Sequence, residues 1–144
     1  MAMQLFIGGA CAGRRDAVAK RFPTALWKRL AADVPFADSH QALAANTPLA
    51  ITGVLEWLRA NLGSADTETL RQQWQSDMTM LCQRADQRNA PLIIIATEIG
   101  RGIVPMQPEQ RQLRDLNGWF TQDAAAQADQ VWYVRHGLMK VIKS

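Results

Sequence analysis

The chain has 144 residues, of which 48% are apolar and 20% are charged. This length fits a single domain spanning residues 1–144, and the composition excludes a disordered, collagen-like or simple coiled-coil protein. The net charge of +3 comes from basic residues that are spread along the sequence without a long Lys/Arg block. Such a balance permits anionic partners such as nucleotides, but it argues against a nucleic-acid-binding protein.

The two cysteines, Cys11 and Cys82, belong to no CxxC pair. They therefore predict neither a zinc site nor a redox motif, and we assign no other metal site. Residues 1–7 lack the basic and apolar regions of a signal peptide, and the longest strongly apolar run, residues 92–96, is too short to span a bilayer. We expect a soluble, cytoplasmic protein with reduced thiols.

The N-terminal half alternates short apolar runs with helix-like patterns. Apolar runs bounded by Gly or Pro predict strands, and apolar residues at helical spacing predict helices. Residues 24–36 are ambiguous, because residues 25–30 fit either a strand or part of a broken helix. The other expected elements are a strand at 4–7, a helix at 14–22, a short helix that Ser39 caps and that runs to residue 45, a strand at 49–52 and a helix at 54–62.

The C-terminal half begins with a long helix pattern, which Asp66 or Thr67 can cap and which runs to about residue 88. The continuous apolar run at 92–96 predicts a strand that is covered on both faces. A glycine-punctuated loop at 97–107 follows, and Pro108 then starts a helix that reaches about residue 128. Two closing strands are expected at 131–134 and 138–142, with a turn at 135–137.

This order of elements predicts an α/β fold. Strands that alternate with helices form a mainly parallel sheet with helices on both faces. The last two strands are too close in sequence for a parallel crossover, so we expect them to form an antiparallel hairpin at one edge of the sheet.

A glycine-rich loop at residues 8–15 joins the first strand to the first helix. The P-loop signature at such a place is G-x-x-x-x-G-K-[ST]: its backbone N–H groups surround a phosphate, its Lys reaches the terminal phosphates and its hydroxyl holds Mg²⁺. Here the loop carries Gly8, Gly9 and Gly13, while Arg14 and Arg15 replace the Lys and the Ser/Thr.

An Arg can pair with a phosphate, often through two hydrogen bonds, so Arg14 suits an anion. Arg15 cannot ligate Mg²⁺, because a guanidinium only donates hydrogen bonds and repels the cation. We predict that Gly8, Gly9, Gly13, Arg14 and Arg15 bind a nucleotide or phosphate. The alternative is an ordinary glycine-rich turn between a strand and a helix.

Two C-terminal motifs carry a family resemblance. Residues 97–105 read Thr-Glu-Ile-Gly-Arg-Gly-Ile-Val-Pro, and a spaced series follows: Arg111, Arg114, Asp115, Gly118, Gln122, Ala128, Asp129 and Val131. With the closing hairpin, these motifs resemble the adenosylcobinamide kinase / adenosylcobinamide-phosphate guanylyltransferase family. The resemblance is specific over residues 91–143, and weaker matches at 55–61, at 35–43 and at the loop glycines extend it toward the N-terminus.

The resemblance implies a three-layer P-loop NTPase (RecA-like) fold and a role in cobalamin biosynthesis. Members of the family phosphorylate the aminopropanol hydroxyl of adenosylcobinamide with ATP or GTP. They then transfer GMP from GTP to that phosphate through a guanylylated histidine. The expected partners are thus a purine nucleotide and a corrinoid, with no nucleic acid, and the expected assembly is a homo-oligomer.

Several family positions are substituted in this chain. The Lys and Ser of the P-loop are Arg14 and Arg15, and the acidic residue after the third strand falls on Gly53, which offers no carboxylate to a Mg²⁺–nucleotide. Most of the segment that carries the acceptor histidine is missing, and neither His40 nor His136 matches its motif. The substitutions argue against kinase activity and more strongly against guanylyl transfer, so we assign no catalytic residue and no firm cofactor.

Glu98 is a well-placed carboxylate that remains, just beyond the C-terminal end of a parallel strand. Ligands bind at that edge of open α/β sheets, so Glu98 and Arg101 are candidate ligand-facing residues. Alternatively, Glu98 caps the loop or pairs with Arg101.

Three functions stay open at this point. The chain is a nucleotide-binding enzyme of the family, or a catalytically inactive relative that serves as a binding, regulatory or structural subunit. The five tryptophans suggest a third possibility, an interaction module, although their spacing is more typical of a hydrophobic core.

Overall fold

Six strands form one sheet in a computed structural model that describes residues 3–63, 66–99 and 107–144. The strands are β1 (Met3–Gly8), β2 (Leu26–Arg29), β3 (Leu49–Thr52), β4 (Leu92–Thr97), β5 (Gln130–Arg135) and β6 (Leu138–Lys143). Their order across the sheet is β2-β3-β4-β1-β5-β6. All neighbouring pairs are parallel except β5 and β6, which form the expected antiparallel hairpin at one edge.

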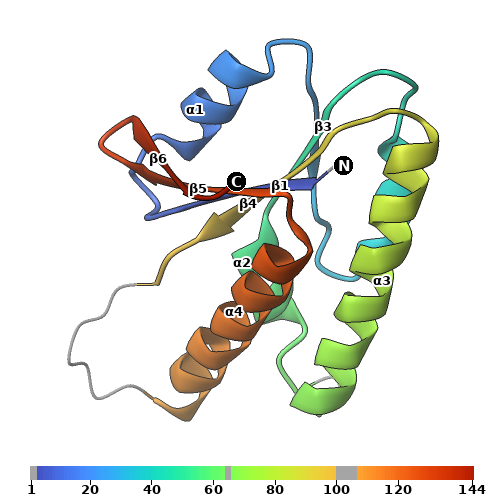
Figure 1. Cartoon of the computed structure of the whole chain (residues 1–144). Helices are drawn as coiled ribbons and strands as arrows, with labels where there is room; N and C mark the ends of the chain where they lie inside the picture. The colour runs from blue at the N-terminus through green and yellow to red at the C-terminus, as the bar shows by residue number, and fades with distance from the viewer. Residues whose placement is uncertain (1–2, 64–65, 100–106) are drawn as a thin grey trace.

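Helices cover both faces of this sheet, as predicted. They are α1 (Arg14–Arg21), the 3₁₀ helix η1 (Phe36–Ala42), α2 (Val54–Ala60), α3 (Thr67–Gln87) and α4 (Pro108–Gln127). Figure 1 shows α1 on one side of the sheet and α2, α3 and α4 on the other. Within the part of the chain that the structure describes, no helix is both long and apolar enough to cross a membrane.

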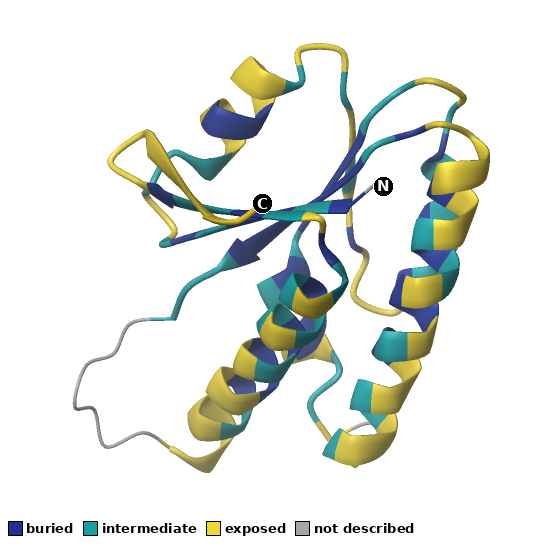
Figure 2. Cartoon of the chain, viewed as in Figure 1, coloured by how far each residue is buried: buried dark blue, intermediate teal, exposed yellow. Residues whose placement is uncertain are grey.

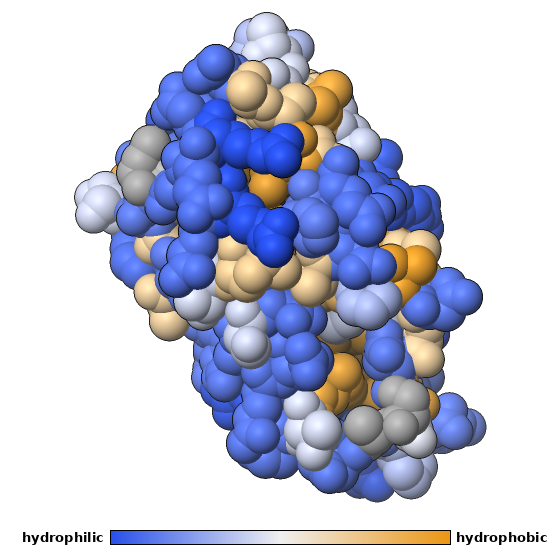
Figure 3. Space-filling view, turned by 90° about the vertical axis from the view of Figure 1, so that its right-hand side faces the viewer, coloured by the Kyte–Doolittle hydropathy of each residue, from blue (hydrophilic) through white to orange (hydrophobic). Residues whose placement is uncertain are grey.

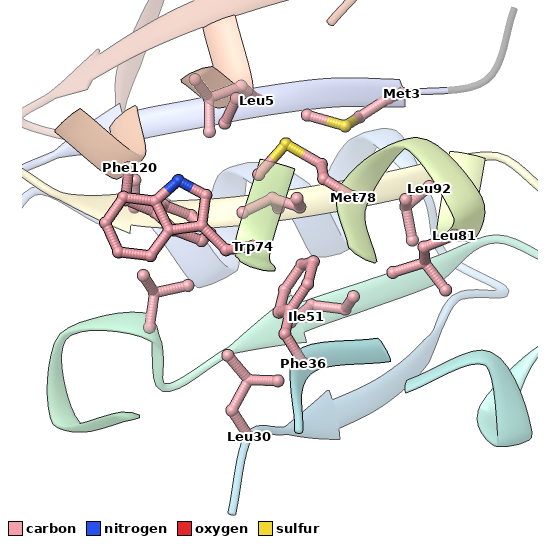
Figure 4. Packing of buried hydrophobic residues seen from close by; sticks show 14 of the residues in the cluster. Met3, Leu5, Leu30, Phe36, Ile51, Trp74, Met78, Leu81, Leu92 and Phe120 are labelled. Atoms are coloured by element: carbon pink, nitrogen blue, oxygen red, sulfur yellow. The ribbon is translucent and has the colours of Figure 1, made fainter. Parts of the chain in front are cut away.

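The main hydrophobic core lies between the sheet and the layer of α2, α3 and α4 (Figure 4). Successive side chains of a strand point to opposite faces, so Leu5 and Ile94 enter this core while Phe6 and Ile93 enter a smaller cluster under α1. This explains the unbroken apolar run of β4, which is buried on both faces. In Figure 2 the buried residues of the helices lie toward the sheet, and β6 is exposed.

Large aromatic side chains fill the centre of the main core. The ring of Phe120 lies 5.5 Å from that of Trp74 and 5.8 Å from that of Phe36, both in edge-on arrangements. Trp57 is also buried, and its indole N–H donates to the carbonyl of Val34. The prediction that tryptophans belong mainly to the core holds for these residues, since Trp74 and Trp57 are at most 5% exposed.

The structure resolves the ambiguity at residues 25–30 and corrects the expected role of Ser39. The ambiguous residues 25–30 contain the strand β2, because Leu26–Arg29 pair in register with Leu49–Thr52 of β3. Ser39 does not cap a helix: it lies inside η1, 1% exposed, and among the described residues its hydroxyl has no hydrogen-bond partner. The helix begins three residues earlier, after Pro35, and ends at Ala42 instead of residue 45.

The remaining boundaries agree with the sequence to within one or two residues. Asp66 caps α3 as expected, accepting a hydrogen bond from the backbone N–H of Thr69. Both cysteines are free, and burial raises the pKa of the Cys82 thiol to about 11. The loop expected at 97–107 falls largely on residues 100–106, which lie outside the described residues.

Figure 3 shows one face of the molecule coloured by hydropathy. Most of this face is hydrophilic, with small apolar areas between the polar ones.

Asp123 of α4 joins the two longest helices. Its carboxylate accepts two hydrogen bonds from the guanidinium of Arg71, each 3.0 Å long, and one of 2.8 Å from the indole of Trp74. Burial alone would raise the pKa of Asp123, but the hydrogen bonds from Arg71, Trp74 and Gln75 outweigh it and hold the pKa below its ordinary value. The ionised carboxylate therefore stabilises the contact between α3 and α4.

Replacing Asp123 by Asn tests this contact. We expect Asp123→Asn to lower the free energy of unfolding at pH 7 by about 1.5–3 kcal/mol, the range for hydrogen bonds to charged groups. Because folding lowers the pKa of Asp123, its contribution is present above the unfolded pKa of about 3.9 and is lost as the pH falls through the folded pKa. Urea titrations at pH 7 and pH 3 should show a smaller gap between wild type and variant at pH 3. An equal gap at both pH values would contradict the assignment.

The centre of the sheet is unusually close-packed at Gly8, the last residue of β1. A Cβ atom placed on Gly8 would lie 2.5 Å from the carbonyl oxygen of Val134 in β5, a distance that side chains do not tolerate. Gly9, one residue later, has nothing within 4 Å of the same position. Only Gly8 is therefore fixed as glycine by its close approach to the neighbouring strand.

This pair gives a matched test of the packing. We expect Gly8→Ala to destabilise the fold by about 1–3 kcal/mol, because the added methyl group must push β5 away from β1. Gly9→Ala is the control, and its stability should stay within about 0.5 kcal/mol of wild type. Urea unfolding followed by circular dichroism measures both. Equal stability of the two variants would show that β5 yields without cost.

Candidate functional site

The loop between β1 and α1 has the shape that its glycines require. Gly13 has a φ of +87° and a ψ of +27°, the left-handed region that other residues rarely adopt, and it forms the N-cap of α1. The backbone N–H of Gly137, in the turn between β5 and β6, donates a 2.8 Å hydrogen bond to the carbonyl of Ala12. The loop is thus held against the hairpin, and the first N–H groups of α1 have no acceptor within the helix.

Arg14, at the Lys position of the P-loop signature, reaches across to the end of β4. One of its terminal nitrogens, Nη1, donates 2.8 Å hydrogen bonds to the carbonyl of Ala96 and to the hydroxyl of Thr97. Burial lowers the pKa of Arg14, the charge of Arg15 lowers it further, and Glu56 partly compensates. The guanidinium nevertheless stays protonated, as arginines in proteins do.

Arg15 differs from its neighbour in its surroundings. It is exposed at the start of α1, and like Arg14 it contributes positive charge where the helix already carries a partial positive charge. Two adjacent arginines repel each other, so an anion beside the loop would relieve that repulsion. The loop is therefore electrostatically suited to an anion.

An open cavity of about 610 Å³ lies beside the loop. Gly9 and Ala12 line it from the loop, Glu98 from the end of β4, and Tyr133 and Arg135 from β5. The backbone N–H of Glu98 donates a 2.8 Å hydrogen bond to the carbonyl of Gly8. The structure thus brings Glu98 next to the glycine-rich loop, although the two are far apart in the sequence.

Other candidates from the sequence lie elsewhere. Arg101 falls outside the described residues. His40 lies in η1, and His136 lies at the turn of the β5–β6 hairpin, where its φ of +54° suits a two-residue hairpin turn with Gly137. Neither histidine lines the cavity beside the loop.

Three residues that the sequence analysis did not propose as site residues also belong to this end of the sheet. Thr97 accepts from Arg14 through its hydroxyl, while its carbonyl accepts a 2.7 Å hydrogen bond from the Nδ2 atom of Asn117. Glu56, in the first turn of α2, lies near enough to Arg14 to affect its pKa. Thr97 begins the motif at 97–105, and Asn117 is a polar residue on the buried face of α4, so these two left a signal in the sequence.

Comparison with known proteins now adds the family. Residues 18–142 match the family described as cobinamide kinase / cobinamide phosphate guanyltransferase. The chain belongs to this family. Its six-stranded sheet, with α1 following the loop after β1, is the P-loop NTPase fold of cobinamide kinases. The match begins inside α1, just after the loop that carries Arg14 and Arg15.

Two curated relatives are bifunctional adenosylcobalamin biosynthesis proteins named CobU. The one from Salmonella typhimurium (strain LT2) is 40% identical over 62 residues, which are 43% of this chain and 33% of the relative. The one from Escherichia coli (strain K12) is 31% identical over 78 residues, which are 54% of this chain and 43% of the relative. The chain thus aligns with less than half the length of the curated relatives that it matches.

Two positions at which the family resemblance implies Mg²⁺ ligation, residues 15 and 53, do not fit the ion. Arg15 presents a guanidinium where a hydroxyl would ligate the ion. Gly53 forms the N-cap of α2 with a φ of +82°, and a Cβ atom there would lie 3.1 Å from Cγ of Arg29 and 3.3 Å from the backbone nitrogen of Leu30. A side chain at residue 53 is therefore strained, and these two positions supply no oxygen ligand.

Arg14 should contribute more to the free energy of unfolding than Arg15. We expect Arg14→Gln to lower the free energy of unfolding by about 1.5–3 kcal/mol, because the end of β4 loses two hydrogen bonds from a charged donor. Arg15→Gln is the matched control, and it should stay within about 0.5 kcal/mol because the residue is exposed. Guanidinium-chloride unfolding measures both variants. Equal losses would mean that Arg14 does not anchor β4.

Proposed function

We propose that this chain binds the phosphates of a purine nucleotide at residues 8–15, within the cobinamide kinase family of cobalamin biosynthesis. The observation that carries the proposal is the anchored side chain of Arg14 at the start of α1. Arginine has five N–H donors, and the two hydrogen bonds to β4 use Nη1 alone. Within residues 3–63, 66–99 and 107–144, the donors on Nε and Nη2 have no hydrogen-bond partner, which leaves them for an anion.

The remaining parts of the loop support the same reading. Gly13 in the left-handed region forms the N-cap of α1 without a side-chain cap, and helix N-termini of this kind are common anion sites. The cavity of about 610 Å³ beside Gly9 and Ala12 offers room for a polyphosphate. Arg135 adds a further positive charge to the rim of that cavity.

Catalysis is a separate matter from binding. Phosphoryl transfer depends on positioning and on neutralising the charge that develops on the phosphate oxygens. Arg14 and Arg15 supply positive charge for that purpose, but Arg15 and Gly53 supply no Mg²⁺ ligand. We therefore propose nucleotide binding without efficient kinase activity. We also propose no guanylyl transfer, because neither His40 nor His136 matches the motif of the family's acceptor histidine.

Calorimetric titration with GTP tests the proposal. We expect wild-type protein to bind GTP with an affinity that Mg²⁺ changes little, since the loop neutralises the phosphates with guanidinium groups. Arg14→Glu should abolish this binding, because it replaces the anchored cation by an anion. ATP, titrated in parallel, shows which purine is preferred.

Arg84→Glu is the matched control for the change in charge. Arg84 is exposed in the last turn of α3. The chain then enters β4 at the N-terminal ends of the parallel strands, whereas the loop lies at their C-terminal ends. The control should bind GTP like wild type, and circular dichroism should confirm that both variants are folded. Absence of GTP binding by wild-type protein at millimolar concentration would refute the proposal.

A catalytically inactive subunit is the second candidate function. It is favoured by the exposed apolar side chains of the edge strand β6, where Leu138 is 75% and Ile142 59% exposed. Such side chains at a sheet edge are typical of a contact with another chain. In that case the wild-type protein would not bind GTP, and its role would depend on the partner at that edge.

A further inference from the structure

A second cavity lies next to the one beside the loop. It has a volume of about 230 Å³ and opens between the end of β4 and the middle of α4. Ile7 and Ile99 give it apolar walls, and Asn117 and Gly118 line it from α4. Glu98 lines both this cavity and the larger one, so the two adjoin at the C-terminal edge of the sheet.

The side chain of Asn117 has an unfilled hydrogen-bonding capacity. Asn117 is 5% exposed, and its Nδ2 atom donates to the carbonyl of Thr97, which fixes the orientation of the amide. Among the described residues, its Oδ1 atom is buried without a hydrogen-bond partner. Buried polar atoms in native proteins are nearly always paired, so an unpaired acceptor in the wall of a cavity indicates a missing N–H or O–H donor.

The neighbouring residue supports the same conclusion independently. Gly118 lies in the interior of α4, where glycine is less favourable than alanine. A Cβ atom on Gly118 would have nothing within 4 Å, so packing within the chain does not explain the glycine. Its missing side chain does, however, leave the cavity open on the side of α4.

We infer that this cavity, defined by Asn117 and Gly118, holds the base of the nucleotide whose phosphates lie at the loop. A purine base is flat and apolar on its faces and carries N–H donors at its edge, which matches apolar walls with one acceptor. Arg114 lies at the same cavity, and a guanidinium can stack on the face of an aromatic ring. The inference rests on the proposed nucleotide binding.

The connection to the phosphate loop runs through Thr97. Its hydroxyl accepts from Arg14, and its carbonyl accepts from Asn117, so one residue of β4 positions the residues proposed for the two parts of the ligand. A base bound at Asn117 and a phosphate bound at Arg14 would therefore both contact side chains that are hydrogen-bonded to Thr97. We expect the base and the phosphates to contribute together to affinity.

Titrations with GTP and with inorganic tripolyphosphate separate the two cavities. Tripolyphosphate has the phosphates but no base, so wild-type protein should bind GTP at least about tenfold more tightly. Asn117→Leu removes the acceptor at similar volume, and Gly118→Leu places a side chain in the cavity. Asn117→Leu should weaken GTP binding by about five- to tenfold, the effect of one lost hydrogen bond, and Gly118→Leu should weaken it at least as much by filling the space for the base. Gly118→Leu keeps the hydrogen bond between Asn117 and Thr97, so it should leave tripolyphosphate binding unchanged.

Gly118→Ala is the control for Gly118→Leu, since a methyl group leaves most of the cavity open and should preserve GTP binding. If Asn117→Leu does not fold, as judged by circular dichroism, the leucine variant at residue 118 decides the question, because it adds a good helix former in open space. Equal affinity of wild type for GTP and tripolyphosphate, or unchanged GTP binding in the folded variants, would overturn the base site while leaving the phosphate site intact. Failure of both ligands to bind wild type would instead refute the proposed function.

Discussion

The candidate site depends on how closely β1 can approach β5. Gly8 has no side chain, and the carbonyl of Val134 occupies the space that a methyl group would need. This approach brings the hairpin turn beside the loop, where Gly137 donates to Ala12, and it leaves room for Arg14 to reach β4 on the other side. The loop thus takes its shape from the two strands that flank β1 as much as from its own residues.

The arginine at residue 14 has a structural contact that a lysine could not make in the same way. A lysine at that position is a mobile point charge, whereas an arginine can hold a neighbouring strand with one nitrogen and still offer donors on the others. In this chain the guanidinium contributes to the fold through Ala96 and Thr97. The proposed phosphate binding would therefore depend on the same side chain as the stability of β4, and a lysine there would alter both.

Much of the fold could be predicted from the sequence. The apolar run of β4, the helix patterns of α3 and α4 and the closing hairpin follow from periodicity and turn residues, since burial on one or two faces dictates them. The strand β2 was ambiguous because it is short and half exposed, so only its pairing with β3 identifies it. The contacts of Arg14 and the unpaired oxygen of Asn117 could not be predicted, because they join segments that only the folded sheet brings together.

These hydrogen bonds between segments that are distant in the sequence have a consequence for how the protein folds. Arg14 and Thr97 are 83 positions apart in the sequence, and contacts between distant segments form slowly because the intervening chain must first be ordered. The glycine-rich loop therefore reaches its final conformation only after β4 and β5 have joined β1. The proposed capacity to bind an anion therefore requires the assembled sheet, and helices that form early would not supply it.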